Sequence, residues 1–173
     1  MKLVVATHNE GKLVEIKRIL NEEFAEISEH IELVTAGSLG LPDPVETGVT
    51  FEQNALIKAR DVAQRTGLPA VADDSGLIVD VLGAAPGILS ARWSGVHGDD
   101  NANNALLLKQ LEDIPDECRT ARFRCAAALA VPKDCVDADL ENAMWKNNGF
   151  ETVRVGEMVG RLIREPRGCK GFG

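Results

Sequence analysis

Residues 2–22 read KLVVATHNEGKLVEIKRILNE and combine a strand, a polar loop and a helix. Residues 2–7 are apolar and partly β-branched, which predicts a short buried strand. The polar loop His8–Gly11 follows. From Lys12 to about Glu22 the apolar residues recur at helical spacing, so one face of the predicted helix carries Leu13, Ile16, Ile19 and Leu20.

The next strand is predicted over residues 31–36, and residues 37–49 are a loop rich in glycine, proline and polar residues. Thr50 and Gln53 have the spacing of a capping box, so a second helix is expected from there to about Thr66. Gly67-Leu68-Pro69 then ends it. The apolar face of this helix carries Phe51, Ala55, Ala59, Val62 and Ala63.

The rest of the chain continues the alternation of strands and helices. Two short strands are expected at 70–73 and 77–82, joined by a turn at Asp74-Ser75-Gly76. We expect a loop over residues 83–87, a helix over 101–113 and a strand over 120–131. A second loop follows over 135–149, and then a strand over 151–163 that is interrupted at Gly156 and Gly160. The pattern predicts one α/β domain over residues 1–173, with a sheet covered by helices.

The 173 residues include 19 Lys and Arg against 27 Asp and Glu, a net charge of −8. Binding the phosphate backbone of a nucleic acid needs a basic face. Base stacking needs aromatic side chains, which make up only 4% of this chain. The composition therefore disfavours a nucleic acid polymer as partner, but it leaves a small anionic substrate open.

We expect neither a membrane partner nor a signal peptide. The apolar run Cys125–Val131 is too short to span a bilayer, and the N-terminus lacks the signal pattern. The four cysteines form no C-x-x-C pair and have no histidine at zinc spacing. Reduced thiols in a cytoplasmic protein are therefore the favoured interpretation, and a zinc site is the weaker alternative.

The first candidate site is Thr7-His8-Asn9-Glu10-Gly11-Lys12, where a strand ends and a helix begins. The N–H groups at a helix N-terminus lack partners, and the helix dipole favours an anion there. Thr7 and Asn9 can donate to phosphate oxygens, and Lys12 can neutralise one of them. An ordinary N-capped turn is the alternative, because the glycines match neither standard nucleotide-binding fingerprint.

The second candidate site is the pair of adjacent carboxylates Asp73 and Asp74, followed by Ser75. Mg²⁺ prefers carboxylate oxygens together with substrate phosphates. Successive strand residues point to opposite faces, so we expect only one of the two to enter a site. An Asx turn closing a hairpin is the alternative. Glu46 offers a further carboxylate for Mg²⁺, although taken alone it is better explained as a solvated surface residue.

Two further groups carry weaker signals. Asn54 and Lys58 are four residues apart and share one helix face, which is usually the solvated side of an amphipathic helix. The stretch Gly87–Arg92 contains a glycine turn, Ser90 and Arg92, which can hold a phosphate. Structural packing is the favoured use of this stretch.

Together these stretches resemble the inosine triphosphatase family, also called the Ham1 or dITP/XTP pyrophosphatase family. Each motif alone is weakly specific, but they occur in the family's order over nearly the whole chain. The resemblance rests on Thr7-His8-Asn9-Glu10-Gly11-Lys12, Glu46-Thr47-Gly48, Thr50-Phe51, Asn54-Ala55, Lys58-Ala59, Ala72-Asp73-Asp74-Ser75-Gly76-Leu77, Gly87, Ser90-Ala91-Arg92, Arg122-Phe123, Arg164-Glu165-Pro166, Gly168 and Gly171-Phe172-Gly173.

The resemblance implies hydrolysis of deaminated purine nucleoside triphosphates (ITP, dITP and XTP) to the monophosphate and pyrophosphate, which cleanses the nucleotide pool. It also implies a homodimer of elongated two-lobed α/β subunits around a long curved mixed sheet. A related enzyme acting on modified pyrimidine triphosphates is a remote alternative, against which the Asp-Asp-Ser-Gly and Thr-x-Asn segments speak.

The resemblance further implies a role for each candidate residue. Glu46 and Asp74 hold Mg²⁺, and Asp74 orients or deprotonates the attacking water. Thr7, Asn9 and Lys12 cradle the phosphates. The remaining substrate-binding residues are His8, Glu10, Gly11, Ser75, Phe172 and Gly173, and Asp73, Asn54, Lys58 and Arg92 support the site.

The family pattern continues past Phe-Gly with an aromatic residue, Asp and Pro, then a strand, a helix carrying a lysine, and a Ser-His-Arg segment. Those elements read the purine base, and this sequence stops at Gly173 inside the motif. The alternative function is therefore a nucleotide-binding homologue that is catalytically impaired.

Overall fold

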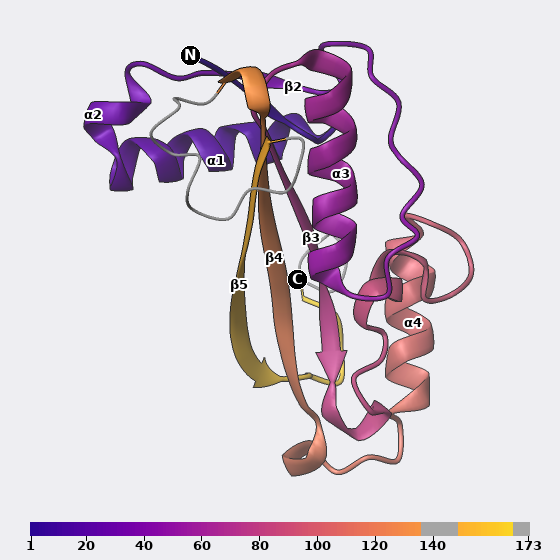
Figure 1. Cartoon of the computed structure of the whole chain (residues 1–173). Coiled ribbons are helices and arrows are strands. Elements are labelled where there is room, and N and C mark those ends of the chain that lie inside the picture. The colour runs from indigo at the N-terminus through magenta and orange to yellow at the C-terminus, as the bar shows by residue number, and fades with distance from the viewer. Residues whose placement is uncertain (136–148, 168–173) are drawn as a thin grey trace. The chain divides into compact units, whose positions relative to one another are not determined.

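The computed structural model describes residues 1–135 and 149–167 of the chain (Figure 1). Its five strands form one sheet in the order β2-β1-β3-β4-β5, and helices accompany the sheet, so the predicted α/β class is confirmed. The strands and helices are β1 (Lys2–Val5), α1 (Glu10–Glu23), α2 (Ala25–Ser28), β2 (Glu32–Thr35), α3 (Phe51–Thr66), β3 (Ala70–Val79), α4 (Asp100–Gln110), β4 (Thr120–Pro132) and β5 (Gly149–Arg161). The single-turn helices are η1 (Asp80–Leu82), η2 (Gly87–Arg92), η3 (Asp116–Cys118) and η4 (Lys133–Cys135).

The first strand pairs in parallel on both sides. Val4 of β1 lies opposite Val34 of β2 and Ala70 of β3. Parallel neighbours need a crossover connection, which α1 and α2 supply between β1 and β2. From β2 the chain continues through α3 to β3, which pairs with the other side of β1. The carboxyl ends of β1 and β2 therefore lie at the same edge of the sheet, where α1 begins.

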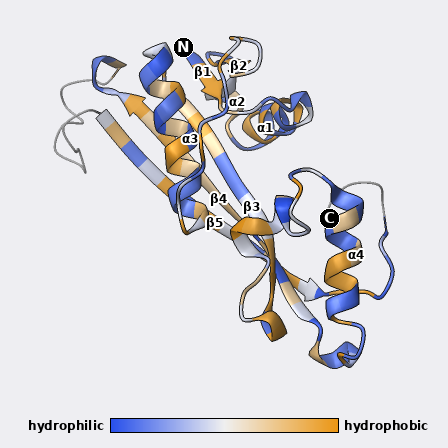
Figure 2. Ribbon diagram, turned by 90° about the vertical axis from the view of Figure 1, so that its right-hand side faces the viewer, coloured by the Kyte–Doolittle hydropathy of each residue, from blue (hydrophilic) through white to orange (hydrophobic). Residues whose placement is uncertain are grey.

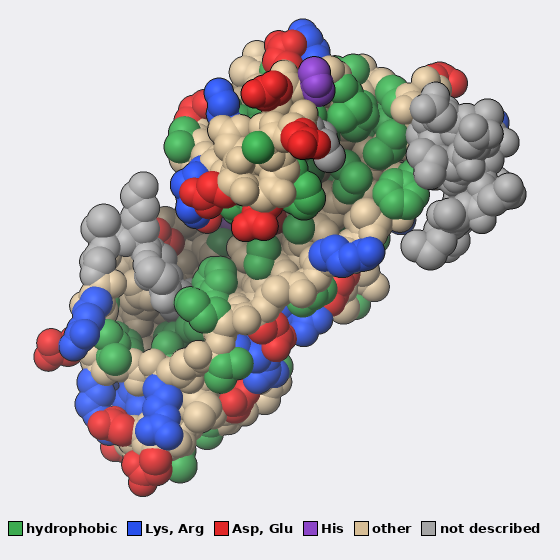
Figure 3. All heavy atoms as spheres, turned by 90° about the vertical axis from the view of Figure 1, so that its left-hand side faces the viewer, with side chains coloured by type: hydrophobic (Ala, Val, Ile, Leu, Met, Phe, Trp, Pro, Cys, Tyr) green, Lys and Arg blue, Asp and Glu red, His purple; other side chains and the backbone are tan. Residues whose placement is uncertain are grey.

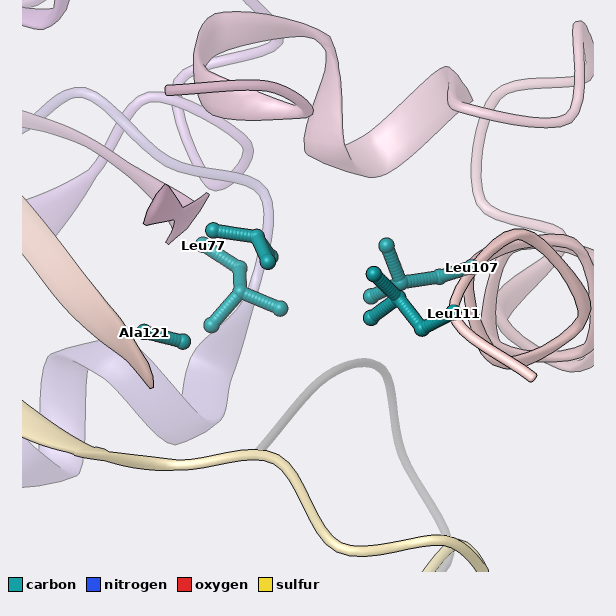
Figure 4. Close-up of a cluster of buried hydrophobic side chains, with 5 residues drawn as sticks. Leu77, Leu107, Leu111 and Ala121 are labelled. Carbon is teal, nitrogen blue, oxygen red and sulfur yellow. The ribbon is translucent and has the colours of Figure 1, made fainter. Parts of the chain in front are cut away.

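The chain divides into two compact units, each with buried side chains of its own. Unit 1 comprises Met1–Asp73 and Ala126–Arg154, and unit 2 comprises Asp74–Cys125 and Val155–Gly173. Buried apolar residues of unit 1 include Val4, Val5, Phe51, Ala55, Ala59, Val62, Ala70, Ala126 and Ala128. In unit 2 the core cluster joins β3, α4 and β4 and consists of Leu77, Val79, Leu107, Leu111 and Ala121 (Figure 4).

Helix α1 begins two residues earlier than predicted, at Glu10 instead of Lys12. Asn9 caps it, because the Asn9 side-chain oxygen accepts the Gly11 N–H. A polar stretch that contains a glycine is typical of a loop. Here the N-cap lies two residues before Gly11, so Glu10 and Gly11 belong to the first turn of α1. Of the predicted apolar face, Leu13, Ile16 and Leu20 are half-buried, and Ile19 is exposed.

Helix α3 matches its prediction, and Figure 2 shows apolar and polar residues alternating along it. Thr50 is the N-cap, and its hydroxyl accepts the Gln53 N–H at 3.2 Å. Gly67 ends the helix at φ +67°, a left-handed conformation that favours glycine. The predicted apolar face of five residues is buried throughout.

The prediction of two strands at 70–73 and 77–82 is wrong, because β3 runs without a break from Ala70 to Val79. Asp, Ser and Gly are poor strand formers, but this segment is part of β3, which follows β1 and precedes β4 in the strand order and pairs with β1 at Ala70 and Val71. Sheet pairing outweighs local propensity there. The Asx turn is therefore excluded as the explanation of Asp74-Ser75-Gly76.

Three other boundaries differ in detail. The predicted breaks at Gly156 and Gly160 are wrong, because β5 continues through both glycines from Gly149 to Arg161. Helix α4 ends at Gln110, earlier than predicted, and strand β4 matches its prediction closely. Most of the predicted loop 135–149 lies outside the described residues.

The surface of the described residues carries both acidic and basic side chains (Figure 3). Acidic and basic side chains are interspersed on the face shown in Figure 3. None of the helices in the described part of the chain has the length and apolar character needed to cross a bilayer. The three described cysteines, Cys118, Cys125 and Cys135, are free thiols.

Candidate active site

The loop after β1 forms the N-terminus of α1, as predicted. The Asn9 side-chain oxygen accepts the Gly11 N–H at 2.8 Å, and the Asn9 N–H donates to the Thr7 hydroxyl at 3.1 Å. The N-capped turn of the alternative interpretation is therefore present. Because the oxygens of both side chains accept bonds, the Asn9 amide NH₂ and the Thr7 hydroxyl proton are the groups that can donate to a phosphate.

His8 and Glu10 of the same loop have partners in the segment that follows β2 and at the end of β2 itself, respectively. His8 Nε2 lies 3.2 Å from a carboxylate oxygen of Asp43, and the Glu10 carboxylate accepts the hydroxyl of buried Thr35 at 3.3 Å. A Cβ on Gly37 would lie 3.4 Å from the His8 ring. These contacts tie the loop to the end of β2. Asp43 and Thr35 were not predicted as partners of this loop, because nothing in the local sequence pattern signals a contact this distant along the chain.

Lys12 is held by the first of the two adjacent aspartates. Its ammonium group lies 2.6 and 2.8 Å from the two carboxylate oxygens of Asp73. The two side chains are 39% and 24% exposed, so the pair is partly shielded from water. Lys12 is thus ion-paired in the first turn of α1, and an anionic ligand has to compete with Asp73 for it.

Glu46 and Lys58 form a second pair of the same kind. Lys58 Nζ lies 3.1 Å from a Glu46 carboxylate oxygen, and the side chains are only 16% and 26% exposed. Asn54, on the same face of α3, is fully buried and accepts the Gly48 N–H. The interpretation of this face as the solvated side of the helix is therefore wrong. The structure brings Glu46, Asn54 and Lys58 together in unit 1.

Asp74 and Ser75 belong to unit 2 and lie in β3, where both are half-buried. Successive residues of a strand project to opposite faces. Because Asp73 extends to Lys12, we expect Asp74 to project to the other face of β3. The expectation that only one of the two carboxylates enters a site stays a prediction.

Ser90 of η2 has a structural role, as favoured from the sequence. It is buried, its hydroxyl accepts the Leu77 N–H at 3.0 Å, and it donates to the Gly87 carbonyl at 2.6 Å. It therefore joins η2 to β3 inside unit 2. Arg92, at the end of η2, is half-buried.

Arg122 of β4 also has a structural partner in unit 2. It lies 2.5 Å from the Asp80 carboxylate and 3.6 Å from that of Glu157 on β5. A hydrogen bond from Thr120, and the hydrogen bond and charge of Arg122, lower the pKa of Asp80. The carboxylate of Asp80 is thereby kept ionised at the end of β3.

Two of the predicted substrate-binding residues, Phe172 and Gly173, lie outside the described residues, as does Gly168. Arg164, from the same C-terminal motif group, is described. It lies 2.8 Å from Asp116 and donates to the carbonyls of Glu112 and Ile114. It therefore fastens the segment after β5 to the turn between α4 and β4.

The carboxylates fit Mg²⁺ better than a closed metal cage. Within residues 1–135 and 149–167, no three His, Cys, Asp or Glu side chains gather as such a cage requires. Mg²⁺ is usually held by one or two carboxylates, with water and substrate phosphates as the other ligands. Glu46 and Asp74 each offer a carboxylate of this kind, and their role as Mg²⁺ ligands stays a prediction.

Comparison with known proteins agrees with these motifs. Residues 3–173 match the Ham1 family. The dITP/XTP pyrophosphatase of Bifidobacterium longum is 62% identical, over all of this chain and 77% of that protein. The enzyme of the same name from Streptomyces avermitilis is 51% identical, over 99% of this chain and 77% of that protein.

Solved structures show the same fold. A dITP/XTP pyrophosphatase from Mycobacterium abscessus is 47% identical with a TM-score of 0.75, covering 97% of this chain and 78% of that one. A HAM1 protein from Coxiella burnetii is 35% identical with a TM-score of 0.78, covering 100% of this chain and 78% of that one. The chain therefore belongs to the Ham1 family.

Proposed function

We propose that this chain is a Mg²⁺-dependent pyrophosphatase that hydrolyses dITP, XTP and ITP to the nucleoside monophosphate and pyrophosphate. The observation that carries the proposal is the 62% identity, over the whole of this chain, to a protein named dITP/XTP pyrophosphatase. The geometry of unit 1 supports it, because a helix N-terminus with Lys12 in its first turn suits a polyanionic substrate.

The triphosphate binds at the start of α1. The Asn9 amide NH₂ and the Thr7 hydroxyl donate to phosphate oxygens, and the helix dipole adds a favourable field. Lys12 leaves Asp73 and neutralises a phosphate charge. His8, Glu10 and Gly11 shape this loop through the contacts described above, and Ser75, Phe172 and Gly173 are the further substrate contacts that the family resemblance suggests.

Glu46 and Asp74 would hold Mg²⁺, which supplies charge neutralisation for the triphosphate and increases the acidity of water. Asp74 orients the attacking water and accepts its proton. The water oxygen forms a bond to the α-phosphorus as the bond from that phosphorus to the bridging oxygen breaks. Pyrophosphate then leaves. Positioning and electrostatics supply most of the rate acceleration in such reactions.

The cellular role that follows is removal of deaminated purine nucleotides from the cytoplasmic pool before polymerases use them. A homodimer is the proposed assembly, on the family resemblance alone. Asp73 and Arg92 support the site from its periphery, and Asn54 and Lys58 support Glu46.

The test is pyrophosphate release from dITP, XTP, dATP and dGTP by the wild type and by Asp74→Asn, with circular dichroism as a check on folding. We expect release from dITP and XTP that the substitution abolishes while the fold is kept. Nucleotide binding without pyrophosphate release by the wild type would instead favour a homologue that only binds.

A further inference from the structure

The loop before α3, residues 46–50, is fastened to the first turns of that helix by helix side chains. The Asn54 amide oxygen accepts the Gly48 N–H at 2.9 Å. One residue later in the loop and one residue earlier in the helix, Gln53 Oε1 accepts the Val49 N–H at 2.7 Å. The backbone of the loop is therefore held at two successive residues.

The bond from Gly48 is partly buried, because Asn54 is fully buried and Gly48 is half-buried. The contact is also close. A Cβ on Gly48 would lie 2.5 Å from the Asn54 side-chain oxygen and 2.9 Å from the Asn54 backbone nitrogen. Because that nitrogen belongs to the helix backbone, it cannot move aside as a flexible side chain would. The loop cannot shift without breaking this partly buried hydrogen bond and leaving the buried Asn54 oxygen without the Gly48 N–H, which carries an energetic penalty.

The same stripe of α3 also holds the side chain of the loop's acidic residue. Lys58 follows Asn54 by one helical turn and lies 3.1 Å from the Glu46 carboxylate. One helix face thus fixes the backbone of the loop through Asn54 and the carboxylate of Glu46 through Lys58.

We propose that Asn54, assisted by Gln53, is a positioning residue that presents the Glu46 carboxylate to a divalent cation. The inference rests on the proposed role of Glu46 as a Mg²⁺ ligand. Residues that orient metal ligands typically contribute 10- to 100-fold in metal affinity. A loop that is fixed before the cation binds loses less conformational entropy on binding than a loop that is free.

The experiment measures Mn²⁺ affinity by electron paramagnetic resonance on the full chain, alongside urea unfolding. For Asn54→Ala we expect Mn²⁺ affinity to fall about 10- to 100-fold. Gln53→Ala removes an exposed partner, so it should weaken Mn²⁺ binding less while keeping the fold. For Asn54→Ala, raising Mg²⁺ to saturation should restore most of kcat, because the variant misplaces Glu46 without removing it.

Asn103 provides a matched control in unit 2. It is 2% exposed, its side-chain oxygen accepts the Ser94 N–H at 2.7 Å, and its amide donates to the Ala91 carbonyl at 3.2 Å. Asn103→Ala therefore removes the same chemistry from another helix–loop junction. We expect it to lower stability as Asn54→Ala does and to leave Mn²⁺ affinity within twofold.

The outcomes separate the inference from the function on which it rests. Unchanged Mn²⁺ affinity in Asn54→Ala and Gln53→Ala, with a loss in Glu46→Gln, overturns the positioning role and leaves Glu46 as a ligand. An equal loss in Asn54→Ala and Asn103→Ala also overturns it, because the effect would then be general destabilisation. Unchanged affinity in Glu46→Gln overturns the ligand assignment and the inference together. Failure of the proposed function appears separately, as a wild type that releases no pyrophosphate.

Discussion

The ion pair between Lys12 and Asp73 makes a prediction that two substitutions test in opposite directions. In the free protein the Lys12 ammonium group contacts both Asp73 carboxylate oxygens, at 2.6 and 2.8 Å. In the proposed complex it contacts a phosphate instead. Lys12→Ala removes the ligand for the phosphate, whereas Asp73→Asn removes only the competitor.

The expected magnitudes differ for stability and for binding. The side chains are 39% and 24% exposed, so breaking the pair should cost about 0.2–1 kcal/mol of unfolding free energy in either variant. A hydrogen bond to a charged group contributes about 1.5–3 kcal/mol. Lys12→Ala should therefore weaken triphosphate binding roughly 10- to 150-fold. Asp73→Asn should bind at least as tightly as the wild type.

The assay is calorimetric titration with a non-hydrolysable α,β-imido analogue of dITP in the presence of Mg²⁺, with urea unfolding of the same samples. Equal stability losses with opposite effects on affinity would support the competition. If Lys12→Ala binds the analogue normally, or if both variants lose affinity to the same extent, the reasoning is refuted.

Three further predictions concern the core, the acid response and the metal. Ser90→Ala leaves the buried Leu77 N–H without its acceptor and should lower the unfolding free energy by about 1–3 kcal/mol in urea titration. The pKa of Asp80 is lowered in the folded state, so its carboxylate stabilises the protein above the unfolded-state pKa, and this contribution is lost as the pH falls through the folded-state pKa. Wild type should therefore be more stable than Asp80→Asn at neutral pH, and the gap should close in acid unfolding curves below about pH 4. Addition of EDTA should stop pyrophosphate release and excess Mg²⁺ should restore it; activity that persists in EDTA would argue against a metal requirement.

The elements with local signals were predictable from the sequence. The Thr50–Gln53 spacing located the start of α3, because an N-cap acts within one turn, and Gly67 located its end. Strand β3 was mispredicted because its local sequence signal differs from the structure that it adopts. Asp74-Ser75-Gly76 is typical of a turn, but the segment is extended as part of the continuous strand β3, because tertiary context can outweigh local propensity.

In the candidate site, too, the features with a local sequence signal were predictable and the contacts between distant residues were not. The motif of Thr7, Asn9 and Lys12 lies at a helix N-terminus, as its strand–loop–helix pattern predicted. The pairing of Lys12 with Asp73 was not predictable, because the two residues are 61 positions apart. Burial of Asn54 was missed because helical periodicity separates polar from apolar faces and cannot identify a polar side chain that is buried through a hydrogen bond to a loop.

The measurement that tests the central claim most directly is pyrophosphate release from dITP and XTP by the 173-residue chain in Mg²⁺, compared with Asp74→Asn. The account predicts one pyrophosphate and one monophosphate for each triphosphate consumed, a strong preference for these substrates over dATP and dGTP, and no turnover by the variant. Release of inorganic phosphate in place of pyrophosphate, or turnover by Asp74→Asn at the wild-type rate, would contradict it.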